Sequence, residues 1–239
     1  MPAPLDRPPG SRVLVLAPHM DDEALGCGGS LRRHVLAGES VTVAYMTDGR
    51  KGDSALNAAE LAPDERERRE DALAAVRADE SRRSAAILGV RDLRFLGNRD
   101  LELAVSVRTR RQVVRLLEEI RPDLVYLPFA ADRHPDHRAT NRIFLAALRE
   151  ARIAAPMCCG YEIWTPVEPN CLVDITSVVA VKRRALKQFR SQMTTIDFSR
   201  CLLGLHAYRS MIHLHGRGYA EAFVLVSAVE YRKLARRAA

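Results

Sequence analysis

Two clusters of histidine and carboxylate side chains are the parts of this sequence best suited to chemistry. Residues 19–23 hold one imidazole and three carboxylates, and residues 132–137 hold two imidazoles and two carboxylates. Imidazole nitrogens and carboxylate oxygens are common ligands of zinc, and the same groups take up and donate protons in hydrolytic reactions. The clusters therefore predict a metal-assisted catalytic site.

The spacing inside each cluster suits one metal ion. His19 and Asp22 are three positions apart, as are His134 and His137, and on a helical turn such a pair projects from one face. Two imidazoles and one carboxylate give the three-ligand arrangement of catalytic zinc, whose open position holds a water with a pKa of about 7. Asp21 adjoins a candidate ligand but points elsewhere, so it can take a proton. Whichever imidazole of the second pair does not bind metal can steady an oxyanion or protonate a leaving amine.

Each cluster follows an apolar run and precedes a helical pattern. Residues 12–18 predict a buried strand followed by a helix over 23–37, and residues 123–129 predict another strand followed by a helix over 134–151. Strands and helices alternate through the first 150 residues or so, which is typical of a parallel sheet with helices on both faces. The fold class is therefore α/β: a Rossmann-like three-layer sandwich with a mostly parallel, doubly wound sheet.

This fold class would bring the two clusters together. With a strand order of 3-2-1-4-5, the first and fourth strands lie side by side, and ligands bind in the crevice at their carboxyl ends. We assume this order here, and count the two clusters as the loops after those two strands. The clusters are then expected to meet around one metal ion.

The remaining segments predict one domain with a covering loop. Residues 1–10 are expected to form a disordered N-terminal tail, and residues 11–239 a single domain. The polar stretch 50–63 predicts an irregular loop long enough to cover a site, and a long helix is expected over residues 64–88. Glu80 falls on or beside the apolar face of that helix, so it requires a partner.

Composition narrows the partners and the compartment. The net charge of +7 comes from basic residues scattered among acids, and aromatic residues make up only 5%, so a nucleic-acid surface is disfavoured. No stretch reaches the roughly 18 apolar residues of a membrane span, and the start lacks the core of a signal peptide. Five cysteines with irregular spacing give no disulfide framework. These features predict a cytoplasmic protein with a small-molecule substrate, no nucleic-acid partner and no stable membrane insertion.

Both clusters match known signatures. Residues 17–23 read A-P-H-M-D-D-E and residues 134–137 read H-P-D-H; weaker matches at residues 77–80 and 95–97 continue through most of the chain. The sequence resembles the LmbE/PIG-L-type zinc N-acetylglucosamine deacetylases, whose signatures are A-H-P-D-D-E and H-x-D-H. Met20 stands where that family usually has proline, and Phe189 and Arg190 stand where a histidine is common.

The resemblance implies a metal site and a base. Zn²⁺ would be held by His19, Asp22 and His137, and Asp21 would be the general base that activates a zinc-bound water. The implied reaction is hydrolysis of the N-acetyl group of an N-acetylglucosamine-type conjugate.

The resemblance also assigns roles around the substrate. His134, oriented by Asp136, would stabilise the tetrahedral intermediate and assist the departing amine. Arg77 and Asp100 match positions that family members use near the sugar. Relatives often assemble as trimers or hexamers, so a homo-oligomer is implied as well.

Other interpretations stay open. The glycines of residues 26–29 prompt a nucleotide-binding Rossmann domain, although Leu31 replaces the expected third glycine and the nearby acids would repel a pyrophosphate. A zinc amidase or esterase that acts on another conjugate would use the same scaffold. An aspartate of the first cluster could simply cap the helix. Arg77 and Glu80 could form a structural ion pair, and Trp164 is interpreted as a packing residue.

Overall fold

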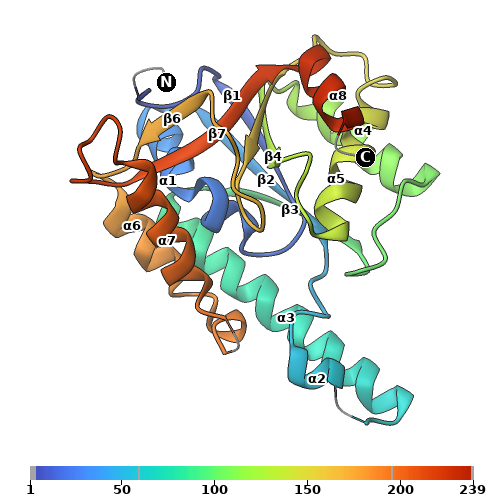
Figure 1. Cartoon of the computed structure of the whole chain (residues 1–239). Helices are drawn as coiled ribbons and strands as arrows, with labels where there is room; N and C mark the ends of the chain where they lie inside the picture. The colour runs from blue at the N-terminus through green and yellow to red at the C-terminus, as the bar shows by residue number, and fades with distance from the viewer. Residues whose placement is uncertain (1–3, 59, 195, 238–239) are drawn as a thin grey trace.

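A seven-stranded sheet forms the centre of the computed structural model, which describes residues 4–58, 60–194 and 196–237 (Figure 1). The strand order is β3-β2-β1-β4-β5-β7-β6. The parallel strands are β1 (Arg12–Ala17), β2 (Ser40–Thr47), β3 (Asp92–Asn98), β4 (Leu124–Pro128) and β5 (Met157–Tyr161). β6 (Cys171–Asp174) and β7 (Ala220–Ser227) complete the sheet, and β7 runs antiparallel to both of its neighbours. The predicted α/β fold class and the assumed order of the first five strands are confirmed.

Helices cover both faces of this sheet, with α1, α3, α6 and α7 on one side and α4, α5 and α8 on the other (Figure 1). Their bounds are α1 (Asp22–Leu36), α2 (Ser54–Ala58), α3 (Pro63–Leu88), α4 (Val107–Ile120), α5 (Pro135–Ala147), α6 (Val179–Leu186), α7 (Phe198–Arg209) and α8 (Ala228–Arg237), with a 3₁₀ turn η1 (Arg190–Gln192). Within the described ranges, no helix is both long and apolar enough to cross a bilayer.

The apolar run of β1 supplies both cores. Val13 and Val15 pack under α1, α3 and α6, while Leu14 and Leu16 pack under α4, α5 and α8. All four side chains are fully buried. A strand that is covered on both faces reads as a continuous apolar run rather than an alternating one, and this is why the sequence pattern identified β1.

The glycines of residues 26–29 lie inside α1, where they allow the helix to approach the sheet. A Cβ atom at Gly26 would lie 2.3 Å from the Tyr161 ring, and one at Gly29 would lie 2.5 Å from the Ile175 side chain. A dinucleotide-binding loop needs its first glycines in the turn before the helix. The nucleotide-binding interpretation therefore loses its basis.

A buried ion pair anchors the middle of α1. The Glu221 carboxylate accepts hydrogen bonds from the backbone N–H groups of Gly29 and Ser30, each at 2.7 Å, and from Lys182 Nζ at 2.6 Å. Lys182 Nζ also donates to the Leu25 carbonyl at 2.7 Å. Because each buried charge has hydrogen-bonding partners, the pair meets the condition under which buried charges are tolerated. It fixes the helix whose first turn carries the predicted metal ligand Asp22.

Three segments differ from the expectation. Within the predicted disordered tail of residues 1–10, the Leu5 N–H donates to the Leu172 carbonyl at 2.7 Å, so the segment lies beside β6; residues 1–3 lie outside the described residues. The stretch 50–63, expected to be irregular, contains the short helix α2. Helix α8, for which the sequence analysis made no prediction, follows β7 directly, with no glycine or proline between them.

Candidate active site

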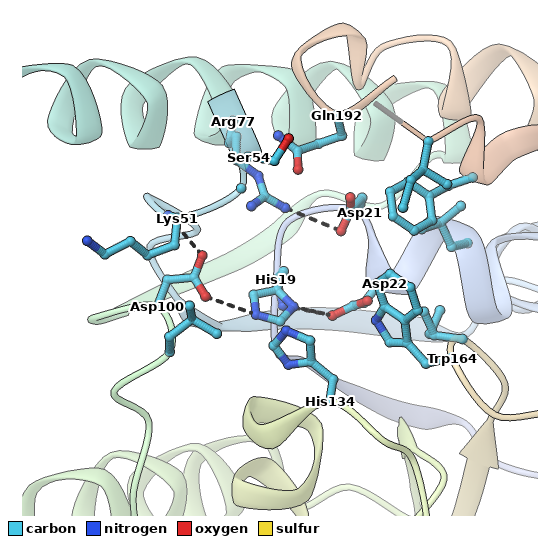
Figure 2. A pocket seen from close by; sticks show the side chains of 16 residues that line it. His19, Asp21, Asp22, Lys51, Ser54, Arg77, Asp100, His134, Trp164 and Gln192 are labelled. Atoms are coloured by element: carbon cyan, nitrogen blue, oxygen red, sulfur yellow. Dashed lines mark hydrogen bonds and ion pairs between the residues drawn. The ribbon is translucent and has the colours of Figure 1, made fainter. Parts of the chain in front are cut away.

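The two predicted clusters meet at the carboxyl ends of β1 and β4. These strands are parallel neighbours, so the loop after β1 and the start of α5 lie at the same edge of the sheet. The ring centroid of His19 lies 4.7 Å from that of His134 and 5.4 Å from that of His137. Figure 2 shows His19, His134 and Asp22 side by side at the centre of the site. The expected contact between the clusters is present.

Asp22 lies between two of the histidines. Its Oδ2 atom is 3.2 Å from His19 Nδ1 and 3.3 Å from His137 Nε2. Ligand atoms of a tetrahedral zinc ion, each about 2.0–2.1 Å from the metal, lie about 3.3 Å apart. These two contacts thus have the spacing of neighbouring ligands of one ion.

The site offers more donor atoms than one ion needs. Within the described residues, two sets of side chains bring ligand atoms to within 4.8 Å of one another: His19, His134 and His137, and His19, Asp100 and Asp136. His134 is therefore a geometric alternative to Asp22 as the third ligand. The hydrogen bonding of the two histidines in α5 and its N-cap distinguishes them.

His137 fits the role of a ligand better than His134. Both ring nitrogens of His137 are buried, and each lies 3.3 Å from a carboxylate oxygen, of Asp22 and of Asp132, without the geometry of a hydrogen bond. His134 is the N-cap of α5, and its Nδ1 accepts the Asp136 N–H at 3.2 Å. Its ring is half-buried and lines the cavity. A metal ion would satisfy His137, whereas His134 is already held and faces the space a substrate would fill.

The charge of the site calls for a cation. Five buried aspartates surround the three imidazoles: Asp21, Asp22, Asp100, Asp132 and Asp136. Burial lowers the pKa of His19, but hydrogen bonds with three of these carboxylates outweigh it and hold the pKa well above its usual value. Burial also lowers the pKa of His137, yet Asp22 and Asp132 raise it to about 9. The raised pKa values favour the protonated forms of His19 and His137, which balance the carboxylates, and a divalent cation would displace those protons on binding.

Asp21 is the carboxylate with the most unusual backbone. Its φ of 156° and ψ of −25° lie outside the regions that non-glycine residues favour, and such conformations, which cost about 1–3 kcal/mol, concentrate at functional sites. Asp21 occupies the N-cap position of α1, but its side chain makes no capping hydrogen bond. Burial raises the pKa of Asp21 to about 6, although Arg77 opposes the shift. The capping interpretation fails for Asp21, and its carboxylate lines the cavity.

Arg77 lies directly behind Asp21. Its Nη1 donates to the Gly49 carbonyl at 2.9 Å, and its Nη2 lies 3.4 Å from Asp21 Oδ1. Glu80 instead accepts hydrogen bonds from Ser191 N and Oγ. The alternative of an Arg77–Glu80 ion pair is therefore wrong. Arg77 lines the cavity and steadies Asp21, and its contact with a sugar stays a prediction.

Asp100 and Asp136 both turn their carboxylates toward His19. Asp100 Oδ1 and Asp136 Oδ2 each lie 3.2 Å from His19 Nε2. Asp100 also accepts the Lys51 N–H at 3.1 Å, and Asp136 accepts the Leu101 N–H at 2.9 Å. Asp136 contacts His134 through its backbone N–H, which donates to His134 Nδ1, whereas its carboxylate faces His19. Asp100 lines the cavity and also holds His19 in place.

Asp132 is a site residue to which the sequence analysis gave no role. Its side chain is fully buried, with Oδ1 3.3 Å from His137 Nδ1 and accepting the His134 N–H at 2.9 Å. Its Oδ2 accepts the Trp164 N–H at 3.1 Å. A carboxylate behind a ligating imidazole fixes the ring orientation and tautomer. The available signal was an aspartate two positions before the first histidine of the second cluster.

A cavity of about 270 Å³ opens in front of these residues. Small-molecule sites usually span about 300–1,000 Å³, so the space suits one compact group such as a single sugar. Its lining combines charged residues of both clusters with apolar side chains from the C-terminal half of the chain, Ile163, Trp164, Ile196 and Phe198. A ligand with both polar and apolar surfaces matches this lining.

Fold and site together define a class: a doubly wound α/β protein with a histidine–aspartate site, of the kind that holds a divalent metal, at the switch point of its sheet. A family model described as PIG-L, GlcNAc-PI de-N-acetylase, matches residues 14–148. The chain belongs to this family, as predicted.

Several relatives carry the family's activity in their names. The chain is 30% identical to the diacetylchitobiose deacetylase of Thermococcus kodakarensis, covering 76% of this chain and 70% of the relative. It is 32% identical to the 1D-myo-inositol 2-acetamido-2-deoxy-alpha-D-glucopyranoside deacetylase of Streptomyces avermitilis, covering 67% of this chain and 59% of that enzyme. The structure superposes on N,N'-diacetylchitobiose deacetylase from Pyrococcus horikoshii with a TM-score of 0.77 and 26% identity, covering 93% and 86% of the two chains. These relatives support the predicted N-deacetylase.

Proposed function

We propose that this chain hydrolyses the N-acetyl group of an N-acetylglucosamine-type conjugate with the help of Zn²⁺. The observation that carries the proposal is that Asp22 contacts both His19 and His137, while His19, Asp22 and the Asp21 carboxylate line the cavity. The named substrates of the relatives, diacetylchitobiose and an acetamido-glucopyranoside of inositol, supply the substrate class.

His19, Asp22 and His137 would hold the metal. A zinc ion there would supply Lewis-acid polarisation of the acetamide carbonyl and would make a water more acidic. Two imidazoles and one carboxylate match the ligand set of catalytic zinc sites. The buried His137 Nε2, which lies 3.3 Å from Asp22 Oδ2 without the geometry of a hydrogen bond, is the feature of this chain that fits such an ion.

Asp21 would take the proton of the attacking water. Its carboxylate is buried and borders the cavity, and its Oδ1 lies 3.4 Å from Arg77 Nη2. A general base works best when its pKa lies near the working pH, and a pKa of about 6 leaves Asp21 mostly ionised at neutral pH. Asp21 can then return this proton to the amine nitrogen as the carbon–nitrogen bond breaks.

His134 would stabilise the oxyanion of the tetrahedral intermediate. Its Nδ1 accepts the Asp136 N–H, so a neutral His134 ring carries its hydrogen on Nε2. Burial, together with the neighbouring His19 and His137, lowers the pKa of His134 and keeps the ring neutral at pH 7. The ring lines the cavity, and a hydrogen-bond donor aimed at developing charge is worth more in such a site than in water.

Substitution of His134 by alanine should lower kcat by about 10²-fold, the usual effect of removing one oxyanion donor, while zinc content stays unchanged. Steady-state kinetics and metal analysis on the same preparation measure both effects. His213→Ala, a histidine outside the cavity, is the matched control. A His134→Ala variant with full turnover would remove His134 from the mechanism.

A substrate panel tests the proposed function itself. The zinc-loaded protein is incubated with N-acetylated sugars and with ester and thioester analogues, and free amine and acetate are both quantified. We expect equal amounts of acetate and amine from N-acetylglucosamine conjugates, because hydrolysis splits one amide into these two products. Release of acid from esters alone would favour the esterase alternative, and no acetate from any amide would refute the deacetylase.

Two further expectations accompany this proposal. A cytoplasmic location rests on the cysteine pattern of the sequence. Assembly as a trimer or hexamer rests on the family resemblance. Both remain predictions.

A further inference from the structure

The cavity has two unlike sides. Its lining includes the polar side chains of Lys51, Arg77, Asp100 and Gln192 and the apolar side chains of Ile163, Trp164, Ile196 and Phe198. In Figure 2, Lys51 and Asp100 lie on one side of His19, whereas Trp164 lies on the opposite side, beyond Asp22 and His134. The Trp164 side chain is 45% exposed. A large apolar ring left open beside a polar site is a common mark of a ligand-binding surface.

Trp164 is held in a fixed position. Its backbone N–H donates to Asp132 Oδ2, the carboxylate that also contacts His137 and His134. Its ring meets the Phe198 ring edge-on, with centroids 5.4 Å apart and an interplanar angle of 89°. Edge-to-face pairs of this kind are favourable. The half-exposed indole also lies nearly parallel to the His134 ring, with centroids 6.5 Å apart, so its position relative to the site histidines is set in advance, which reduces the cost of ordering it on binding.

The orientation of a bound sugar follows from these two sides, and this step rests on the proposed function. The acetamide on the second carbon must lie over His19, Asp22 and His137. The first and third carbons flank that carbon in the ring, so they point to opposite sides of the cavity. If the hydroxyl groups of the third and fourth carbons turn to Arg77 and Asp100, the anomeric carbon turns toward Trp164.

We propose that Trp164, backed by Phe198, determines what may be joined to the anomeric carbon: a flat, uncharged ring that stacks on the indole. A second pyranose presents such a surface with its C–H face, and an aromatic aglycone presents it with its π face. Both share the chemistry that an exposed indole recognises. Trp164 thus acts in substrate specificity and not only in packing.

A matched set of glycosides tests this role. The methyl glycoside of N-acetylglucosamine has no ring at the anomeric position, whereas its phenyl glycoside and N,N'-diacetylchitobiose each have one. Trp164→Ala should lower kcat/KM for at least one ring-bearing substrate about tenfold more than for the methyl glycoside, and Trp164→Phe should restore most of the difference. Tyr208→Ala, which removes an exposed aromatic ring of α7 outside the cavity, is the control.

The outcome of this comparison identifies the ring. Selective loss on the phenyl glycoside indicates an aromatic aglycone, and selective loss on the disaccharide indicates a second sugar. An equal loss on the methyl glycoside and on both ring-bearing substrates would overturn the proposal, because Trp164 would then support the site without contacting the added ring. Unchanged ratios in Trp164→Ala would overturn it as well.

Fluorescence separates this proposal from the proposed function. Trp164 is the only tryptophan of the chain, so tryptophan emission reports on the Trp164 side of the cavity alone. Metal-free protein is titrated with the phenyl glycoside and with diacetylchitobiose, so that binding is read without turnover. A saturable emission change that is stronger than the change with the methyl glycoside supports the contact between Trp164 and the added ring, even if the substrate panel yields no acetate. Acetate release without any selective emission change would overturn the proposed role of Trp164, whereas the proposed deacetylase activity would be kept.

Discussion

Replacement of Asp21 by asparagine should lower kcat by about 10²–10⁴-fold, the range for loss of a general base, and should leave the zinc content of the protein unchanged. Asparagine keeps the size of the side chain but cannot accept the proton of an attacking water. The Asp21 carboxylate lies 3.4 Å from Arg77, whereas Asp22 is the carboxylate that contacts both His19 and His137. The variant should therefore bind metal and substrate and fail at proton transfer.

The decisive measurements are kcat and zinc per chain on the same sample. Asp79→Asn is a matched control, because Asp79 is an exposed aspartate of α3 that pairs with Arg82. Its kinetics should equal those of the parent protein. If Asp21→Asn lost zinc to the same extent as a ligand variant, Asp21 would be a ligand and the division of roles between Asp21 and Asp22 would be wrong.

His137→Ala should abolish zinc binding and reduce activity to background. The change removes a buried nitrogen that lies 3.3 Å from the Asp22 oxygen and is otherwise without a hydrogen bond among the described residues. It also leaves the buried Asp22 and Asp132 carboxylates without the imidazole that they flank. Zinc content after dialysis, activity at saturating zinc, and the shift of the unfolding temperature on adding zinc measure the effect.

His206→Ala controls for the loss of a buried ring. His206 is as fully buried as His137, and within the described residues its nitrogens also lack hydrogen-bond partners. It lies in α7 and does not line the cavity. The His206 variant should be less stable but should still bind zinc and be further stabilised by it, because a ligand that binds only the folded state raises stability. Undiminished zinc affinity in His137→Ala would mean that His134 completes the ligand set in its place.

The position of the site could be predicted from the sequence because few features decide it. The runs before His19 and His134 are apolar on every residue, which is typical of strands covered on both faces. Once these strands are neighbours, the loops that follow them must lie together. Local pattern and one assumption about strand order were sufficient.

The division of labour within the site required tertiary structure. His134 and His137 are equivalent by spacing, and only their burial and hydrogen bonds distinguish them. The contacts of the Asp100 and Asp136 carboxylates with His19 could not be predicted, because both aspartates are distant from His19 in sequence and only the fold brings them together. Trp164 was interpreted as a packing residue because the neighbouring sequence does not indicate whether the side chain is exposed. Its exposure depends on the conformation of its loop, which Asp132 fixes by accepting the Trp164 N–H.

The pairing of β1 with β4 sets when the proposed zinc site can form during synthesis. His19 and Asp136 are 117 positions apart, and chains emerge from the ribosome with the N-terminal part first. A nascent chain that ends before α5 offers only His19 and Asp22 from the expected ligand set. Binding of zinc by the proposed ligand set must therefore follow translation through His137, and products truncated before that residue should stay metal-free even in zinc-replete cells.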